Sequence, residues 1–218
     1  MDDDAHGRVA DMRHTPSYVL SDVDEIKRLI RENPWATIVS PPATGLVASH
    51  YPVLLEETAD DSISIVSHLG RPDEQLHELG DHEVLLIVQG PHGYISPGWY
   101  PEDQIIPTWN HVTAHLYARP EVLSDDENFR VLGTLVDHFE RVMPDPSTLA
   151  LDPEGTRRVA RGTVGVRLRV TRVDARWKLS QDKAPAVVER VIEELEHGEH
   201  YPNPALAREM RRAHGGTQ

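Results

Sequence analysis

The segment TVGVRLRVTRVDARWKLSQ (residues 163–181) contains two runs of alternating apolar residues that differ in parity. The first run occupies even positions and the second odd ones: Val164, Val166, Leu168 and Val170, then Val173, Ala175, Trp177 and Leu179. Because successive side chains of a strand point to opposite faces, one continuous strand cannot place both runs on the same face. The change of parity predicts a β-bulge or a corner near Thr171–Arg172, the kind of bend that a small barrel needs.

The segment IIPTWNHVTAHLYARP (residues 105–120) is predicted to be a strand with two unlike faces. One face is small and apolar and consists of Val112, Ala114 and Leu116. The other is broad and aromatic and carries two imidazoles: Trp109, His111, Thr113, His115 and Tyr117. The first face is typical of a core, whereas the second needs another explanation.

The rest of the chain mixes strands and helices without a regular βαβ alternation, which predicts an α+β barrel. Strands are predicted at residues 35–40, 46–57, 62–68 and 82–90, and helices at 21–33, 72–80, 124–143, 153–161, 184–198 and 203–215. Residues 90–107 are rich in Gly and Pro, so they are expected to form a loop that holds at most a short strand.

Finer expectations concern the helices and the limits of the domain. Ser21 and Asp24 have capping-box spacing and are expected to begin the first helix. The inward face of the helix at 124–143 is expected to consist of Phe129, Leu132, Leu135, Val136 and Phe139. Residues 1–12 are expected to be a flexible tail, residues 13–195 the barrel domain, and residues 196–218 a helical extension.

The charge balance bears on nucleic-acid binding. The 218 residues include 22 basic and 36 acidic ones, which gives a formal net charge of −14. This balance opposes tight binding to nucleic acid, which depends on neutralisation of phosphates by Lys and Arg. Two local basic clusters are interpreted as solvated helix faces: Arg157, Arg158 and Arg161, and Arg208, Arg211 and Arg212. Direct nucleic-acid binding is therefore not expected.

Several classes of protein are excluded by composition. The chain has no cysteine, which excludes disulfides, thiolate nucleophiles and cysteine-bound zinc or iron–sulfur centres. The longest apolar run, Val84 to Val88, is too short to span a bilayer. The N-terminal MDDDAHGRV is acidic and lacks the apolar segment of a signal peptide, so a cytoplasmic location is expected.

Common cofactor and metal motifs are absent. There is no GxGxxG, GxxxxGK[ST] or GxSxG, so a Rossmann site, a P-loop and a nucleophile elbow lack support. His77, Glu78 and His82 form HExxxH, which is one residue longer than the helical zinc spacing and is interrupted by Gly80. No metal site is expected there. Thirteen histidines nevertheless make ligand or cofactor binding worth testing.

Polar residues do gather on separate predicted strands. Ser49 and His50 lie within one strand, and Ser67, His68 and Arg71 lie where the next strand meets its helix. Arg71 beside hydroxyls and a helix N-terminus suits a phosphate, because a guanidinium and free N–H groups both favour an anion. The alternative is a surface arginine beside a serine whose hydroxyl is satisfied within the chain.

Taken in order, five short segments resemble the PaiB family of FMN-binding transcriptional regulators. They are SHYP (49–52), VSHLGRP (66–72), VQGPHGYISPGWY (88–100), PTWN (107–110) followed by His115, and KLSQ (178–181). The resemblance runs from about Met12 to about Leu195. It implies an antiparallel, Greek-key-like split β-barrel with peripheral helices, shared with flavin reductases and pyridoxamine-phosphate oxidases. Proteins of this fold usually dimerise and hold FMN in the subunit interface.

The same resemblance implies a set of cofactor-binding residues. The phosphate would meet Ser67, His68 and Arg71. Ser49 and His50 would lie near the phosphate or the ribityl chain. The ring system and the closure of the site would involve Trp109, Asn110, His115, Lys178, Ser180 and Gln181. The broad face of residues 109–117 would then be a wall for a planar cofactor or a dimer partner; the alternative is that it packs on another subunit or a helix without a ligand.

One departure from the family pattern concerns the phosphate. Where the family commonly shows HLARANPQ, this chain has HLGRPDEQ (68–75), so that Asp73 and Glu74 replace Asn and Pro. Negative charge near a dianionic phosphate is expected to weaken its binding.

Three functions follow from the resemblance. The first is a homodimeric FMN-binding protein, with an oxidoreductase reaction on a small molecule and His111 and His115 as the catalytic candidates. The second is a haem b protein, similar to the piperazate synthases that form nitrogen–nitrogen bonds, with an axial ligand among His50, His68, His111 and His115. The third is a DNA-binding repressor, which ranks lowest because the chain is acidic and lacks a basic recognition helix.

Overall fold

The computed structural model describes residues 15–101 and 106–215. The chain forms two compact units, each built from separate parts of the sequence. Unit 1 comprises Met1–Ser21, Gly90–Thr113 and Asp174–Gln218, and unit 2 comprises Asp22–Gln89 and Ala114–Val173. Residues 1–12, expected to be a tail, lie outside the described residues, and the expected domain limits stay a prediction.

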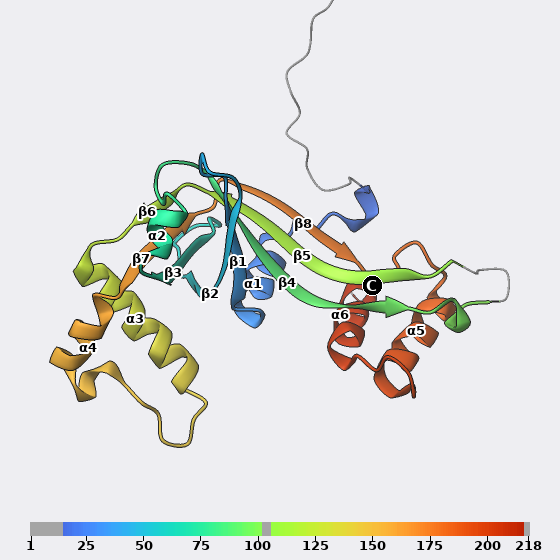
Figure 1. The fold of residues 1–218 in the computed structure, drawn as a ribbon. Coiled ribbons are helices and arrows are strands. Elements are labelled where there is room, and N and C mark those ends of the chain that lie inside the picture. Colours follow the sequence, from blue (N-terminus) through green and yellow to red (C-terminus); the bar gives the residue numbers. More distant parts are fainter. Residues whose placement is uncertain (1–14, 102–105, 216–218) are drawn as a thin grey trace, which may run out of the picture. The chain divides into compact units, whose positions relative to one another are not determined.

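Eight strands form one sheet in the order β6-β7-β3-β2-β1-β4-β5-β8 (Figure 1). The strands are β1 (Trp35–Ser40), β2 (Val47–Glu56), β3 (Ser64–Gly70), β4 (Val84–Ile95), β5 (Thr108–Ala118), β6 (Pro120–Val122), β7 (Thr163–Arg169) and β8 (Arg172–Lys178). Pairing is antiparallel between β1 and β2, β1 and β4, β2 and β3, β3 and β7, and β6 and β7. The strands β4, β5 and β8 run from one unit into the other.

The predicted corner lies between β7 and β8. Extended pairing stops after Arg169 and starts again at Arg172. Within unit 2, the backbone N–H of Val170 donates to the carbonyl of Ile63 (2.9 Å), and that of Thr171 donates to the carbonyl of Tyr117 (2.9 Å). Val170 therefore bonds to the residue just before β3, whereas the next residue, Thr171, bonds to β5. This confirms the corner and explains the change of apolar parity.

Chain connectivity shows that the sheet is curled. Only Arg119 separates β5 from β6, yet the two strands lie six places apart in the strand order. In a flat sheet that separation would be about 29 Å, at about 4.8 Å between neighbouring strands. One residue spans only about 3.5 Å, so the sheet must close toward a barrel. The expected α+β barrel is confirmed.

The core of unit 2 lies between β2, β3 and the helix α3 (Asp125–Glu140). Its buried cluster consists of Leu54, Val66, Leu123, Val131 and Leu135. Figure 1 shows α3 together with α4 (Pro153–Ala160), and α3 contacts both β3 and β7. Ser124 and Glu127 form a capping box at the start of α3, which satisfies backbone N–H groups that have no partner within the helix.

The inward face of α3 differs from the predicted one. The buried residues are Asn128, Val131 and Leu135, whereas Phe139 is exposed. Asn128 is buried because its amide Nδ2 donates to the Thr163 hydroxyl (3.0 Å) and to the Thr163 carbonyl (3.3 Å). A pattern of apolar residues alone does not reveal a buried amide. Of the predicted residues only Leu135 is buried, and the buried face is rotated toward Asn128 and Val131.

Two other predicted boundaries were also wrong. The helix α1 (Val23–Glu32) begins at Asp22 rather than Ser21, because the Asp22 carboxylate accepts from the backbone N–H groups of Asp24 and Glu25. The helix α2 (Asp73–Leu76) is shorter than predicted.

The first part of the Gly- and Pro-rich segment, residues 90–95, continues strand β4. β4 continues to Ile95, and only a 3₁₀ turn (Pro97–Trp99) follows it. Within unit 1, a Cβ at Gly93 would lie 3.0 Å from Leu206 and 3.1 Å from Asn203. Gly93 therefore lets the strand approach α6 closely, and the short strand that the predicted loop was expected to hold is this extension of β4. Residues 102–105 lie outside the described part of the chain.

The remaining helices belong to unit 1. They are α5 (Pro185–His197) and α6 (Pro204–Gly215), which pack together and are joined by an ion pair between Arg211 and Glu196 (2.9 Å). Among the described residues, no helix is long and apolar enough to cross a membrane.

Two glycines of unit 2 give opposite expectations for stability. At Gly165 in β7, an added Cβ would lie 2.9 Å from Cα of Asn128, so Gly165→Ala should lower the free energy of unfolding by about 1–3 kcal/mol. At Gly133 in α3 nothing lies within 4 Å, so Gly133→Ala should raise it by about 0.5–1 kcal/mol. Urea denaturation of both variants measures the difference, and equal effects would contradict the packing of α3 on β7.

Candidate functional site

The predicted site residues fall into both units, and each group is described within its own unit. Unit 1 contains Trp109, Asn110, His111, Lys178, Ser180 and Gln181. Unit 2 contains Ser49, His50, Ser67, His68, Arg71 and His115.

The two faces of β5 are those predicted from the sequence. Val112, Ala114 and Leu116 are buried, while the broad face is half-buried and Trp109 is 56% exposed. Asn110 belongs to the buried face and is itself fully buried. The strand therefore presents an amide to the interior and an indole to the surface.

A cavity of about 250 Å³ lies in unit 1 beside Asn110. It is lined by Tyr18, Tyr100, Ile106, Pro107, Thr108, Asn110, Lys178, Ser180, Asp182 and Lys183. The amide of Asn110 donates to the Ser180 hydroxyl (2.9 Å) and contacts the sulfur of Met210 in α6 (3.4 Å). Three of the predicted cofactor residues thus converge on one cavity, although Asn110 lies about 70 positions before Lys178 and Ser180 in the chain.

The turn after β8 is held in place from both sides. Ser180 adopts a left-handed backbone conformation, with φ at 66°. The N–H of Leu179 donates to the side chain of Gln181 (2.7 Å), and His214 of α6 bonds to the Leu179 carbonyl (3.0 Å). Gln181 also donates to the Trp177 carbonyl, so its side chain folds back on the turn.

Lys178 brings a cation to the cavity wall. Its ammonium group donates to the Thr108 hydroxyl and to the Trp109 carbonyl (2.6 Å), and it lies 5.9 Å from the centre of the Tyr18 ring. Burial lowers the pKa of Lys178, while the carboxylate of Asp182 opposes this shift. The ammonium group of Lys178 is thus held in place by two hydrogen bonds and is partly shielded from water.

Tyr100 places an unsatisfied hydroxyl at the same cavity. The residue is only 6% exposed, and its buried hydroxyl makes no hydrogen bond of normal geometry with the described residues, although the Ser180 hydroxyl lies close enough to interact with it. Burial and the Asp182 carboxylate raise the pKa of Tyr100, although the nearby Ser180 hydroxyl acts in the opposite sense. The phenol is therefore a neutral donor at ordinary pH.

His111 and His115 both lie on the broad face of β5, and both are half-buried. Burial, and after it the positive charge of Lys178, lower the pKa of His111. At neutral pH His111 is thus an uncharged imidazole, which can accept a proton. Neither histidine lines the cavity of unit 1.

Unit 2 contains a polar network that the sequence did not reveal. The buried ring of His77 bonds through Nδ1 to the Ser40 hydroxyl (2.7 Å) and through Nε2 to the Ser49 hydroxyl (3.0 Å). The Asp73 carboxylate accepts from the hydroxyls of Ser49 (2.9 Å) and Tyr51 (2.6 Å). The network therefore joins β1 and β2 to the turn around α2.

The acceptor at Asp73 sets the direction of these hydrogen bonds. Since Ser49 donates to Asp73, its oxygen accepts from Nε2–H of His77, and Nδ1 accepts from Ser40. Burial lowers the pKa of His77, which keeps the ring neutral. Hydrogen bonding from Tyr51 lowers the pKa of Asp73, which keeps the carboxylate ionised.

The residues expected at the phosphate are engaged within the chain. The hydroxyl of the fully buried Ser67 donates to the Pro52 carbonyl (2.7 Å). Arg71 forms an ion pair with Glu74 (2.7 Å) and donates through Nε to the Arg161 carbonyl (3.2 Å).

Two predicted histidines of unit 2 have different settings. His50 is exposed, on the opposite face of β2 from Ser49. His68 is half-buried, and its buried Nδ1 makes no hydrogen bond within the described ranges. Burial lowers the pKa of His68, so its imidazole is neutral.

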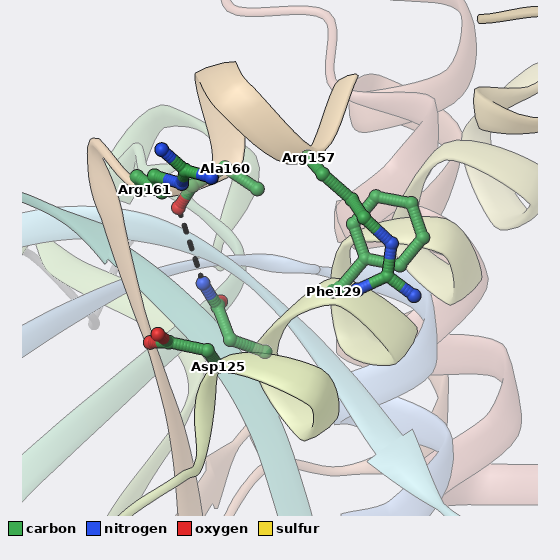
Figure 2. A pocket seen from close by; sticks show the side chains of 6 residues that line it. Asp125, Phe129, Arg157, Ala160 and Arg161 are labelled. Carbon is green, nitrogen blue, oxygen red and sulfur yellow. Dashed lines mark hydrogen bonds between the residues drawn. The ribbon is translucent and has the colours of Figure 1, made fainter. Parts of the chain in front are cut away.

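A second cavity, of about 190 Å³, lies between α3 and α4 in unit 2 (Figure 2). The guanidinium of Arg157 stacks 4.3 Å from the centre of the Phe129 ring and pairs with Asp126 (3.0 Å). Asn128 donates to the Ala160 carbonyl (3.4 Å), at the end of α4. None of the predicted site residues lines this cavity.

Comparison with known proteins agrees with the resemblance seen in the sequence. The family model described as "Putative FMN-binding domain" matches residues 12–172. The Bacillus subtilis "Protease synthase and sporulation protein PAI 2" is 30% identical over 201 residues, which cover 90% of this chain and 95% of that protein.

Similar solved structures confirm the split β-barrel fold. The FAD and haem binding protein from Mycobacterium smegmatis matches with a TM-score of 0.55 and 17% identity, over 78% of each chain. The flavocytochrome Anf3 from Azotobacter vinelandii matches with a TM-score of 0.52 and 13% identity, over 73% of this chain and 68% of that one.

The network of unit 2 makes a prediction about stability and pH. His77→Leu leaves the buried Ser40 hydroxyl without its partner, so it should cost about 1–3 kcal/mol at pH 7. Burial lowers the pKa of His77 below its ordinary 6.5, so the unfolded chain takes up a proton there before the folded protein does. Wild-type protein therefore loses stability as the pH falls below 6.5, and the deficit of the variant should narrow toward pH 5.

Urea denaturation at pH 7 and pH 5 measures that deficit. The control is His50, an exposed histidine of β2 in the same unit. His50→Leu should change the free energy of unfolding by less than about 0.5 kcal/mol. A deficit of His77→Leu that is the same at both pH values would show that the folded protein does not hold this ring neutral.

Proposed function

Because this chain belongs to the FMN-binding domain family of PaiB-like proteins, we propose that it binds a flavin and acts as an oxidoreductase on a small molecule. The observation that carries the proposal is the cavity of unit 1, which Asn110, Lys178 and Ser180 line together with Tyr100, whose buried hydroxyl has no well-formed hydrogen bond to the described residues. An unpaired buried hydroxyl costs about 1–3 kcal/mol, so a fold keeps one at a cavity where a ligand can satisfy it.

The donors on the cavity wall fit the polar edge of a flavin ring. Lys178 and Tyr100 present an ammonium and a neutral phenol, which are donors to carbonyl and ring nitrogen acceptors. A cavity of about 250 Å³ is smaller than a whole nucleotide cofactor, so it would take only part of one. A bound flavin would supply the hydride or electron transfer, and the chain supplies orientation and charge.

Lys178 has a second role in this proposal. A positive charge beside a flavin ring stabilises the negative charge that the ring gains on reduction. Asp182 and Lys183 lie on the same wall and set the balance of charge there. His111, which burial keeps neutral, is the proposed acid or base for the substrate, and His115 remains a second candidate.

A homodimer is part of the proposal. In unit 1 the rings of Trp109, Tyr94 and Tyr201 form a row, with centroid distances of 6.1 Å and 5.4 Å. Trp109 and Tyr201 are both exposed. Exposed aromatic groups of this kind are enriched at protein interfaces, which supports a second copy of the chain as the partner.

A haem is the second candidate cofactor, and His68 is the observation that favours it. Iron binds the neutral imidazole, and burial keeps His68 neutral by lowering its pKa. His50, His111 and His115 remain alternative axial ligands, but His50 is exposed. Absorption separates the two cofactors, since a haem has one intense Soret band and a flavin two broad bands.

Direct DNA binding is not proposed. Arg211, the central residue of the basic cluster on α6, pairs with Glu196 (2.9 Å) and Glu189 (3.4 Å). These carboxylates offset the charge that phosphates would require, in a chain that already carries −14. A regulatory role of the PaiB type would therefore be indirect, through the ligand.

Tyr100 gives the test of the cavity. Tyr100→Phe removes a hydroxyl that has no well-formed hydrogen bond to the described residues, so the free energy of unfolding should stay the same or rise by about 1 kcal/mol. The same change should weaken flavin binding about five- to tenfold, because it removes one hydrogen bond to the ligand. Flavin fluorescence quenching measures the affinity.

Tyr201→Phe is the matched control, because this tyrosine is exposed, lies outside the cavity, and keeps its ring in the aromatic row when only the hydroxyl is removed. It should leave the flavin affinity unchanged. An equal effect of the two substitutions on affinity, or a loss of stability in Tyr100→Phe, would remove the cavity from the proposal.

A further inference from the structure

The turn between β3 and α2 joins a cation to a carboxylate that is mostly buried. Nη1 of Arg71 lies 2.7 Å from a carboxylate oxygen of Glu74, and the Glu74 side chain is only 12% exposed, against 45% for Arg71. The guanidinium is further fixed by its hydrogen bond to the Arg161 carbonyl. Arg71 therefore points its charge at a partner within its own turn.

The carboxylate of Glu74 is held where water cannot screen it well. Its second oxygen, Oε2, is buried and accepts no hydrogen bond from the described residues. Next to it in the chain, Asp73 is ionised and tied to the hydroxyls of Ser49 and Tyr51. The turn thus carries two carboxylates, of which Glu74 pairs directly with Arg71.

We propose that Glu74 determines ligand specificity at this turn, by holding Arg71 in an ion pair and so selecting against a terminal phosphate monoester. This inference rests on the proposed flavin binding. It means that the protein distinguishes FMN poorly from riboflavin, which differs from it by the phosphate alone. The discrimination comes from a carboxylate of the chain and not from the absence of an arginine.

The physical reason is competition for one guanidinium. Arg71 has five N–H donors, of which one serves Glu74 and one the Arg161 carbonyl, so Nη2 still has donors to offer. A phosphate dianion at Nη2, however, comes within a few ångströms of a fixed carboxylate. Like charges at that distance repel, and burial of one of them reduces screening by water and salt. The attraction to Arg71 is therefore largely offset.

Two other donors expected near a phosphate, the hydroxyls of Ser67 and Ser49, are already used. The Ser67 hydroxyl serves the Pro52 carbonyl, and the Ser49 hydroxyl serves Asp73. A ligand group at this turn that donates hydrogen bonds, such as a sugar hydroxyl, suits Oε2 of Glu74 better than a phosphate does.

The experiment compares FMN with riboflavin by fluorescence titration of wild type and Glu74→Gln. Gln keeps the length of the side chain and removes its charge, which leaves Arg71 without an ionic partner. Wild type should bind the two flavins within about threefold of each other. Glu74→Gln should bind FMN at least tenfold more tightly and riboflavin with unchanged affinity, because one charge-assisted contact to the phosphate is gained.

Two controls tie the gain to Arg71. Glu83→Gln makes the same change of net charge at an exposed residue after the turn, and it should leave both affinities unchanged. The double variant Glu74→Gln with Arg71→Ala should lose the gain for FMN, as expected for residues in direct contact. A gain that persists without Arg71 would overturn the inference.

The exposed Arg71 supplies a variant that does not depend on the folding of Glu74→Gln. Arg71→Ala alone should reduce FMN affinity by less than about threefold, since Glu74 already occupies the guanidinium. A tenfold loss for FMN but not for riboflavin would show that Arg71 holds the phosphate despite Glu74, which overturns this inference and leaves flavin binding intact. Failure of every variant to bind either flavin would overturn both proposals.

Discussion

A short connection decides the architecture: a single residue, Arg119, links β5 to β6, although these strands lie at opposite sides of the strand order. The sheet must curl for so short a link to reach both strands. The corner after β7 meets the same requirement, because β7 and β8 are also far apart in the strand order and joined by a short link. Arg119 itself fastens the connection, since its guanidinium donates to the carbonyls of Gly80 (2.8 Å) and Asp81 (2.6 Å) at the end of the α2 turn. The curl of the sheet and the position of that turn are thereby linked.

The network around His77 in unit 2 and the cavity of unit 1 differ in how their buried polar groups are hydrogen-bonded. In unit 2 a chain of hydrogen bonds satisfies Ser40, His77 and Ser49 and ends on an ionised Asp73. In unit 1 the Tyr100 hydroxyl remains unsatisfied beside a cavity. A satisfied network rigidifies a fold, whereas an unsatisfied group at a cavity costs stability unless a ligand pairs with it. The ligand is proposed at the cavity of unit 1 because this hydroxyl lies where Asn110, Lys178 and Ser180 also converge.

Sequence reasoning reached the barrel because a change of parity near Thr171 requires a β-bulge or a corner, and because strands and helices do not alternate regularly. It failed where the controlling fact is contact between distant residues: Gly93 allows a strand to approach α6, and Asn128 is buried by a bond to Thr163. The resemblance grouped Asn110, Lys178 and Ser180, and the structure places them at one cavity; their role in cofactor binding stays a prediction. Tyr18 and Tyr100 were missed, because a tyrosine that lines a cavity has no periodic signal, although Tyr100 stands at the end of the most distinctive segment.

The most direct test of flavin binding is the absorption spectrum of the protein after incubation with riboflavin and haemin together, followed by gel filtration. Riboflavin is the appropriate flavin because it needs no phosphate contact, so the result depends on the ring and sugar alone. We predict two broad flavin bands that elute with the protein, and their loss in Tyr100→Phe with Lys178→Ala combined. An intense Soret band without flavin, or protein that elutes with neither chromophore, would contradict flavin binding at this cavity.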